Sequence, residues 1–280
     1  MSGKNLPVKE AFLREWSSAA KAWRKWRREF AIQSQAATNL LVEAAAITPG
    51  MGVLDLASGC GEPAISVARA TGAGGRVVAT DIVPEMLLGA REYGLQAGCQ
   101  NVDFVAANAE ALPFPEIFDR LTCRFGVMFF PSVERAMGEV RRVLKPSGRA
   151  VFVAWGDSQY NTFYAATTGV LMKYSTTPSR PDLAHRFAEP GSLSAVLREA
   201  PFQEIGETVH SIAWPWPGPP EEFWDYSVEV RVSFRRVFET LPPAEQQQAQ
   251  EESLAEMRRY YDGHRVNFSA QIVIATGVSK

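Results

Sequence analysis

A loop with two glycines, Gly59 and Gly61, follows a short apolar run at 53–56 and precedes a helical pattern that begins near Ile65. The apolar run predicts a buried strand. Glycines permit a tight turn and let backbone N–H groups approach a ligand at the N-terminus of the next helix. The sequence therefore predicts a site for a small polar ligand on this loop.

The spacing of the loop leaves two ligand classes open. Residues 59–64 (Gly-Cys-Gly-Glu-Pro-Ala) satisfy the dinucleotide-binding pattern with alanine in its last position. Asp55 lies at the end of the strand, four positions before Gly59. Its carboxylate would repel a pyrophosphate and attract an ammonium or sulfonium group, so it favours an amino-acid-bearing ligand.

A second carboxylate, Asp81, ends the next expected strand at 76–81, 20 residues past Gly61. An acidic residue at this place can accept hydrogen bonds from both hydroxyls of a ribose. Asp81 also suits the N-cap of the helix that starts near Pro84, and the two roles are compatible. Met86 in that helix is read either as an adenine contact or as a core residue.

Residues 55–61 (Asp-Leu-Ala-Ser-Gly-Cys-Gly) resemble the first motif of class I S-adenosylmethionine-dependent methyltransferases, with Ala57 where glycine is usual. Residues 141–149 (Arg-Arg-Val-Leu-Lys-Pro-Ser-Gly-Arg) closely resemble the segment after the fourth strand in the ubiquinone and menaquinone methyltransferase-like group. The resemblance covers about 40–155. It implies S-adenosylmethionine as the cofactor.

The resemblance also implies which residues contact this cofactor. Residues 108–114 resemble the adenine-site loop of the family, with Asn108 where aspartate is usual. An amide oxygen can still accept a hydrogen bond from the exocyclic amine of adenine. The implied cofactor-binding residues are Asp55, Ala57, Ser58, Gly59, Gly61, Asp81, Ile82, Met86, Asn108, Ala109, Glu110 and Arg124.

Methyl transfer from a sulfonium needs alignment and exclusion of water more than it needs an acid or a base. A base becomes necessary when the acceptor is an alcohol or a phenol. Tyr260 and His264 are weak candidates for that base, and each also reads as a structural residue. No acidic set suited to a magnesium ion is visible, so we expect no metal.

Aromatic residues follow one face of an expected helix at 9–30, with cations on the other face. One interpretation is that the tryptophans dock on the core while the cations are solvated. The alternative is that Trp23 and Trp26 roof the ligand site. With Phe130 and Trp155 near the ends of later strands, they form the predicted substrate pocket.

The pattern of elements predicts an α/β fold, and the resemblance implies a seven-stranded, doubly wound Rossmann-like sheet with an antiparallel seventh strand. We expect the fourth strand at 118–130, a turn at 145–148 and two helices within 221–262. The expected organisation is an N-terminal helical cap at 1–48 and a methyltransferase domain at 49–280. Two insertions, at about 156–188 and 214–264, are expected to act as lids.

The chain of 280 residues has 29 basic and 31 acidic side chains, so we expect no nucleic-acid partner. Three scattered cysteines suit a reducing compartment, and no apolar run approaches about 20 residues. We expect a cytoplasmic protein without an integral membrane segment. The first 30 residues hold eight basic and three acidic side chains, which leaves a membrane-bound quinone acceptor open. The sequence does not indicate the oligomeric state.

Three functions are compatible with these patterns. The first is methyl transfer by in-line displacement to oxygen, carbon or nitrogen of a small apolar or aromatic acceptor. The second is a non-catalytic module that holds S-adenosylmethionine or its product, S-adenosylhomocysteine. The third, an NAD-linked oxidoreductase, is disfavoured by Asp55 and by the loop at Asn108.

Overall fold

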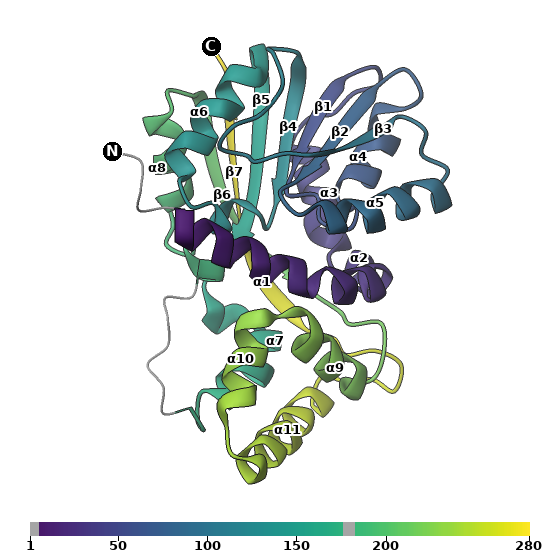
Figure 1. The fold of residues 1–280 in the computed structure, drawn as a ribbon, viewed down its shortest axis with the longest axis vertical. Coiled ribbons are helices and arrows are strands. Elements are labelled where there is room, and N and C mark those ends of the chain that lie inside the picture. Colours follow the sequence, from purple (N-terminus) through teal and green to yellow (C-terminus); the bar gives the residue numbers. More distant parts are fainter. Residues whose placement is uncertain (1–5, 176–182) are drawn as a thin grey trace.

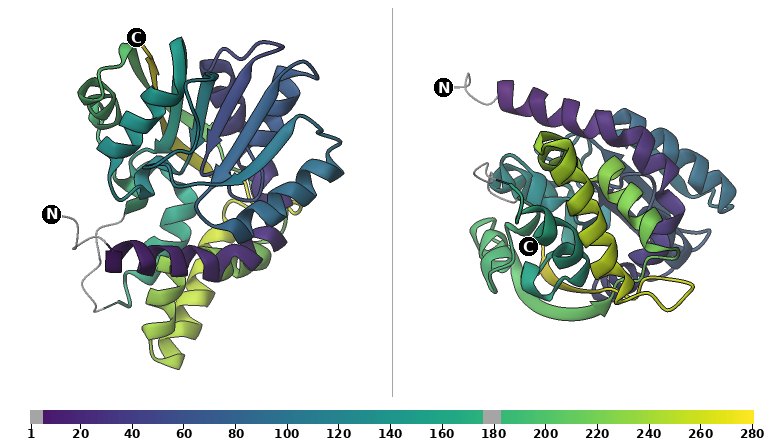
Figure 2. Two further views of the ribbon diagram at one scale, coloured as in Figure 1. Left: turned by 45° about the horizontal axis from the view of Figure 1, so that its top comes forward. Right: turned by 90° about the horizontal axis from the view of Figure 1, so that it is seen from below.

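The computed structural model describes residues 6–175 and 183–280, and it has a central sheet flanked by helices (Figure 1). Further helices, among them α9, α10 and α11, lie beyond one end of the sheet, and α1 lies between them and the sheet. Figure 2 shows α1 running beside α5 in both views. The expected cap at 1–48 and lid at 156–188 each extend into residues that lie outside the described ranges.

One sheet holds all seven strands in the order β3-β2-β1-β4-β5-β7-β6. The strands are β1 (Gly52–Leu56), β2 (Arg76–Asp81), β3 (Val102–Ala106), β4 (Phe118–Arg124), β5 (Leu144–Trp155), β6 (Gln203–Ala213) and β7 (Ser269–Val278). β7 is antiparallel to both of its neighbours, β5 and β6. The expected Rossmann-like sheet with an antiparallel seventh strand is confirmed.

Helices cover both faces of this sheet. α3, α4 and α5 pack on one face and α6 and α8 on the other. The longer helices are α1 (Leu6–Lys25), α2 (Arg27–Gln33), α3 (Gln35–Ala44), α4 (Ala64–Thr71), α5 (Pro84–Gln96), α6 (Val133–Val143), α8 (Ser192–Glu199), α9 (Pro220–Val230), α10 (Val232–Thr240) and α11 (Pro243–Arg258). The shorter ones are η1 (Val127–Phe129), η2 (Ser158–Tyr160), α7 (Thr162–Tyr164), η3 (Ala165–Gly169) and η4 (Leu183–His185).

The order of the strands fixes where a ligand can enter. The chain runs from β1 outward to β2 and β3, and then returns to the other side of β1 for β4 and β5. At such a reversal the connections leave on opposite sides, so a crevice opens at the carboxyl ends of the strands. The ends of β1, β2 and β4 therefore face the place where a ligand is expected.

The fourth strand is shorter than predicted. β4 ends at Arg124, and residues 127–129 form the 3₁₀ helix η1 instead of continuing the strand to 130. Phe125 has a φ of +57°, a left-handed conformation that a strand does not accommodate. Apart from Gly126, residues 125–130 are apolar, and such a stretch fits a buried strand and a buried turn equally well, so the sequence does not locate the break.

The predicted turn at 145–148 is an irregular part of β5. Its pairing with β4 shifts register between Phe118 and Arg120, and Ser147 has a φ of +62°. Ser147 donates a backbone hydrogen bond to Ser279, and Ser279 donates one to Gly148. These bonds to the C-terminal segment keep the Lys-Pro-Ser-Gly stretch within the sheet.

The segment 221–262 forms three helices instead of the expected two. The additional helix, α10, is separated from α9 by Arg231, whose φ and ψ of −88° and 87° are not helical. The aromatic spacing of α9 continues into α10, so the sequence pattern does not mark the break. α11 ends at Arg258, before Tyr260.

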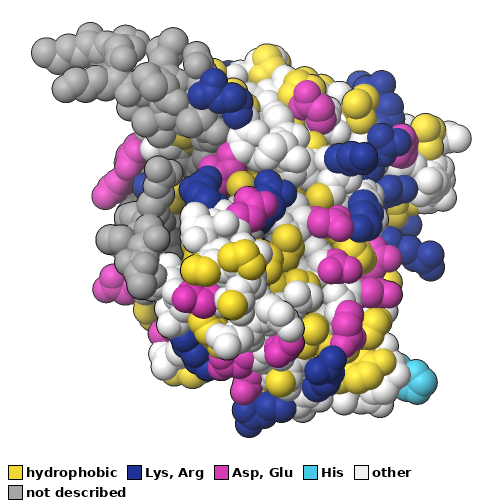
Figure 3. All heavy atoms as spheres, turned by 60° about the horizontal axis from the view of Figure 1, so that its bottom comes forward, with side chains coloured by type: hydrophobic (Ala, Val, Ile, Leu, Met, Phe, Trp, Pro, Cys, Tyr) yellow, Lys and Arg dark blue, Asp and Glu magenta, His cyan; other side chains and the backbone are white. Residues whose placement is uncertain are grey.

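Basic and acidic side chains are interspersed on the face that includes α1 and the helices beyond it (Figure 3). Several cations of α1 are paired there: Arg24 with Glu92, and Lys25 with Glu229. The excess of basic residues in this segment is thus partly neutralised by its neighbours. Within 6–175 and 183–280, no helix combines the length and apolarity needed to cross a membrane.

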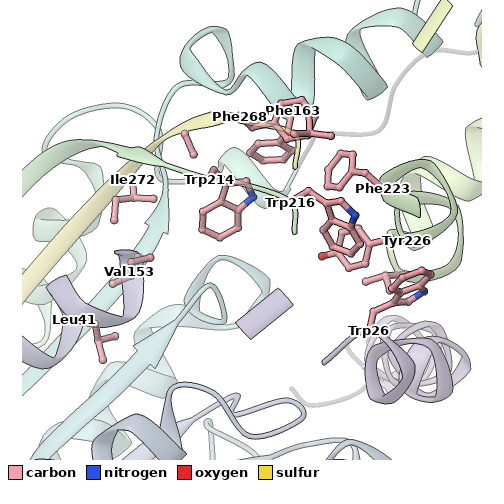
Figure 4. Close-up of a cluster of buried hydrophobic side chains, with 14 of the residues drawn as sticks. Trp26, Leu41, Val153, Phe163, Trp214, Trp216, Phe223, Tyr226, Phe268 and Ile272 are labelled. Carbon is pink, nitrogen blue, oxygen red and sulfur yellow. The ribbon is translucent and has the colours of Figure 1, made fainter. Parts of the chain in front are cut away.

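A buried aromatic cluster joins the sheet to the helices beyond it (Figure 4). Trp214 and Trp216, in the segment after β6, are at most 2 % exposed. Trp216 contacts Trp26 at the end of α1 and Tyr226 of α9, with ring centroids 5.6 and 4.8 Å apart. The cluster fixes α1 against α9, and so it determines what covers the carboxyl edge of the sheet.

Candidate functional site

A cavity lies at the carboxyl edge of the sheet, between the ends of β1, β2 and β4 and the inner face of α1. It encloses about 1270 Å³ when its open mouth is included. Most of the implied cofactor residues line it: Ala57, Ser58, Gly59, Asp81, Ile82, Met86, Asn108, Ala109, Glu110 and Arg124.

The glycine loop is shaped by left-handed residues. Ala57, Gly59 and Gly61 have φ values of +54°, +52° and +122°. Gly61 does not itself line the cavity, because it packs on α5, where a Cβ would lie 3.0 Å from Cδ1 of Tyr93. At Ala57 the conformation explains why glycine is usual: an L-residue pays roughly 1–2 kcal/mol there.

Asp81 presents a half-buried carboxylate to the cavity. Its Oδ2 accepts a hydrogen bond from the backbone N–H of Gly59 at 3.0 Å, and its Oδ1 accepts one from Val83 at 2.9 Å. Burial raises the pKa of Asp81 to about 6, while these backbone N–H groups hold it down. Each oxygen keeps a further lone pair, so the carboxylate can accept from two neighbouring hydroxyls.

Asp55 differs from its expected place, because its carboxylate lies behind the loop and does not line the cavity. The residue is fully buried; Oδ1 accepts a hydrogen bond from Oγ1 of Thr122 at 2.6 Å, whereas Oδ2 has no partner among the described residues. Burial raises the pKa of Asp55 to about 7. The carboxylate of Asp55 can therefore attract a cationic ligand only across the glycine loop and not by direct contact.

Arg124 lies at the end of β4 and is 5 % exposed. Its Nη1 donates to Oγ of Ser34 at 2.7 Å and also to Oγ1 of Thr38, and its Nη2 donates to the backbone carbonyl of Glu62 at 3.0 Å. The guanidinium carbon is 5.4 Å from the ring centre of Phe30. Arg124 thereby fixes α3 and the glycine loop together beside the cavity.

The end of the cavity next to β3 is formed by residues 108–110 with Ile82 and Met86. Oδ1 of Asn108 accepts a hydrogen bond from the backbone N–H of Glu110 at 3.1 Å, which fixes the amide. Oε1 of Glu110 accepts from the backbone N–H of Ser132 at 2.8 Å. This end of the cavity therefore combines the apolar side chains of Ile82 and Met86 with polar groups that are fixed by hydrogen bonds.

The remaining wall of the cavity is aromatic. Of the four residues predicted for a substrate pocket, Trp23 and Phe130 line this cavity, whereas Trp26 and Trp155 do not. Trp26 is turned toward α9, where its Nε1 donates to Glu229 at 2.9 Å, and Trp155 stacks behind Phe125 with ring centroids 4.0 Å apart. The bond to Glu229 thus holds Trp26 away from the cavity, and the ring of Phe125 lies against Trp155.

Neither catalytic candidate lies in the cavity wall. His264 is exposed, and the ring of Tyr260 packs on Phe268 with centroids 5.7 Å apart. Cys60 does line the cavity, but burial raises the pKa of its thiol to about 12, so it remains protonated. Among the described residues no cluster of potential metal ligands is found.

Several lining residues were not among the predicted site residues, including Trp16, Arg27, Glu62 and Tyr93. Trp16 had a signal, since it shares the aromatic face of Trp23; its ring lies 5.2 Å from that of Phe129. Tyr93 donates a hydrogen bond to Oε1 of Glu62 at 3.3 Å. The sequence did not distinguish Arg27, because its neighbouring cations were expected to face solvent.

Comparison with known proteins places this cavity in context. The model of the ubiE/COQ5 methyltransferase family matches residues 21–174. The chain is similar to the ubiquinone/menaquinone biosynthesis C-methyltransferase UbiE of Shewanella pealeana, with 40 % identity over 121 residues, 42 % of this chain and 48 % of that protein. The UbiE of Methylobacterium nodulans is 32 % identical over 166 residues, 55 % of this chain and 66 % of that protein.

The matched segment thus spans only about half to two thirds of the length of these relatives. Among solved structures, the YcgJ protein of Bacillus subtilis aligns with a TM-score of 0.56 and 20 % identity over 88 % of this chain and 99 % of that one. A methyltransferase-like protein of Bacillus halodurans aligns with a TM-score of 0.56 and 23 % identity over 87 % and 98 %. At these identities the structural likeness shows only the fold. The family model matches more than half of the chain, and so the chain belongs to the ubiE/COQ5 methyltransferase family.

Proposed function

We propose that the chain is an S-adenosylmethionine-dependent methyltransferase whose acceptor is a small aromatic or apolar molecule. The observation that carries this proposal is the division of one cavity into a polar edge and an aromatic wall. The polar edge follows the ends of β3, β2, β1 and β4 in that order. The aromatic wall includes Trp16 and Trp23 of α1, which also pack against the cluster of Ala20, Val83 and Met86.

The residues of the polar edge fit the cofactor. Asp81 would accept from the ribose hydroxyls, and Asn108 and Ala109 would bind the adenine edge between Ile82 and Met86. Beyond the glycine loop, the half-buried Glu62 and the buried Arg124 offer an anion and a cation to the amino-acid group. Ala57, Ser58 and Gly59 would line the path between these two ends, with Gly61 shaping the loop and Asp55 acting from behind it.

When bound, S-adenosylmethionine supplies an electrophilic methyl group on a positively charged sulfur. The chain's own contribution is to align an acceptor and to exclude water, which can supply several kcal/mol of the barrier reduction, up to about 7–11 for well-oriented groups. The faces of Trp23, Phe125 and Phe130 suit a planar acceptor and a neighbouring positive charge. The UbiE relatives are named C-methyltransferases of ubiquinone/menaquinone biosynthesis, which favours a carbon atom of a quinone-related acceptor as the methylated atom.

The test is transfer of a labelled methyl group from S-adenosylmethionine to substituted hydroquinones, phenols and amines. We expect labelled product with at least one hydroquinone and loss of activity in Trp23→Ala, because that change opens the aromatic wall. Binding of S-adenosylhomocysteine with no transfer to any of these acceptors would favour the non-catalytic module. Binding of NAD in place of S-adenosylhomocysteine would contradict the proposal.

A further inference from the structure

Arg27, the first residue of α2, brings a positive charge to the wall of the cavity. Its Nη1 donates to the backbone carbonyl of Arg24 at 2.8 Å, and its Nη2 donates to Oε1 of Gln96 on α5 at 3.2 Å. Both acceptors are neutral. A guanidinium has five N–H donors, so this half-buried cation retains donors and charge for a further partner.

The neighbouring cations have other roles. Arg24 forms an ion pair with Glu92, and Lys25 forms one with Glu229. Arg28 is exposed to solvent. Within the described residues of α1 and α2, Arg27 is thus the basic side chain that faces the cavity, and no described carboxylate forms an ion pair with it.

The position of Arg27 relative to the glycine loop indicates what it can reach. The positive charge of Arg27 acts on the pKa of Cys60, the central residue of that loop, against the effect of burial. Its partner Gln96 lies one turn beyond Tyr93, which packs on Gly61 and bonds Glu62. Arg27 therefore lies past the loop, at the end of the polar edge that also holds Glu62.

We propose that Arg27 binds a carboxylate group presented inside the cavity, and that this contact ties the α1–α2 segment to the bound ligand. A planar guanidinium holds a carboxylate through two parallel N–H donors. The inference rests on the proposed function, because the methionine group of the cofactor presents such a carboxylate. An aromatic acid as the acceptor would present another.

The first arm of the test compares two nucleosides by calorimetry. S-adenosylhomocysteine carries the amino-acid group, and 5′-methylthioadenosine lacks it. Arg27→Gln is expected to weaken binding of S-adenosylhomocysteine about tenfold to hundredfold, as for other charge-assisted hydrogen bonds, and to leave 5′-methylthioadenosine within about twofold. Arg27→Lys should restore part of the loss, and the solvent-facing control Arg28→Gln should change neither affinity.

The second arm tests whether the carboxylate that Arg27 binds belongs to the acceptor. Binding of 1-naphthoate and 1-naphthol is measured with the wild type and with Arg27→Gln, and a loss confined to naphthoate supports that source. If Arg27→Gln lowers the affinity for both ligands of a pair equally, the role of Arg27 is structural and the proposal is overturned. An unchanged affinity for all four ligands would overturn it as well. If the wild type binds neither nucleoside, the proposed function fails, and the naphthoate arm alone decides on Arg27.

Discussion

Asp55 and Asp81 end neighbouring parallel strands, yet the fold gives the two carboxylates different surroundings. Asp81 is half-buried, lines the cavity and is held by two backbone N–H groups. Asp55 is fully buried and has one oxygen without a partner among the described residues. Asp81 can therefore accept from a ligand directly, whereas ionised Asp55 remains a cost to the folded protein.

That cost predicts a pH-dependent stability. Folding raises the pKa of Asp55 from 3.8 to about 7, so the folded state holds this proton where the unfolded state releases it. The contribution of Asp55 to stability is full below about pH 4 and is lost as the pH rises toward 7. Asp55→Asn should remove this loss, so that between pH 4 and pH 8 the free energy of unfolding of the wild type falls a few kcal/mol more than that of the variant.

Urea denaturation of the ligand-free proteins across this pH range measures the difference. Asp225→Asn, at an exposed position of α9, serves as the control and should follow the wild type. Parallel curves for the wild type and Asp55→Asn would show that the burial of this carboxylate carries no ionisation cost.

At the scale of elements, the loop after β1 and the end of β4 fit against each other. Gly126 follows the left-handed Phe125, and a Cβ placed on it would lie 2.5 Å from Cβ of Ala57 and 3.0 Å from Sγ of Cys123. The glycine is required because the two chain segments approach closely. The shape of the cofactor loop thus depends on where β4 ends.

Gly126→Ala should therefore destabilise the protein by about 1–3 kcal/mol, as overpacking does, and should weaken binding of S-adenosylhomocysteine. Adding Ala57→Gly removes the closer of the two clashing groups and should recover part of the loss. The matched control is Gly138→Ala within α6, where a Cβ meets nothing within 4 Å and helix propensity favours alanine by about 1 kcal/mol. Thermal denaturation and calorimetry measure both effects. Equal behaviour of the two glycine variants would refute the close-approach argument.

Local patterns predicted the elements that build the polar edge. Glycines after an apolar run predicted the unit of β1, the glycine loop and α4. A carboxylate after an apolar run predicted the end of β2 at Asp81. The end of β4 could not be predicted, because Phe125 adopts its left-handed φ between Arg124 and Gly126. A single glycine there fits an interrupted strand as well as a turn. Likewise, nothing in the sequence between α9 and α10 marks the break at Arg231.

At the scale of the whole molecule, α1 is fixed by partners from distant parts of the chain. Glu229 of α9 accepts from Lys25 and from the indole of Trp26, and Glu15 pairs with Arg236 of α10. These contacts turn Trp26 away from the cavity and leave Trp23 facing it. The sequence gives the amphipathic face of this helix, but which tryptophan lines the cavity depends on contacts about 200 residues apart, which no local pattern contains.

We expect the carboxyl edge of this sheet to bind S-adenosylmethionine, with Asp81 on its ribose. Calorimetric titration with S-adenosylhomocysteine, for the wild type and for Asp81→Asn, tests it most directly, with NAD as the comparison ligand. The wild type should bind S-adenosylhomocysteine but not NAD, and Asp81→Asn should weaken this binding about tenfold or more while the variant remains folded. Unchanged affinity in folded Asp81→Asn, or binding of NAD alone, would contradict it.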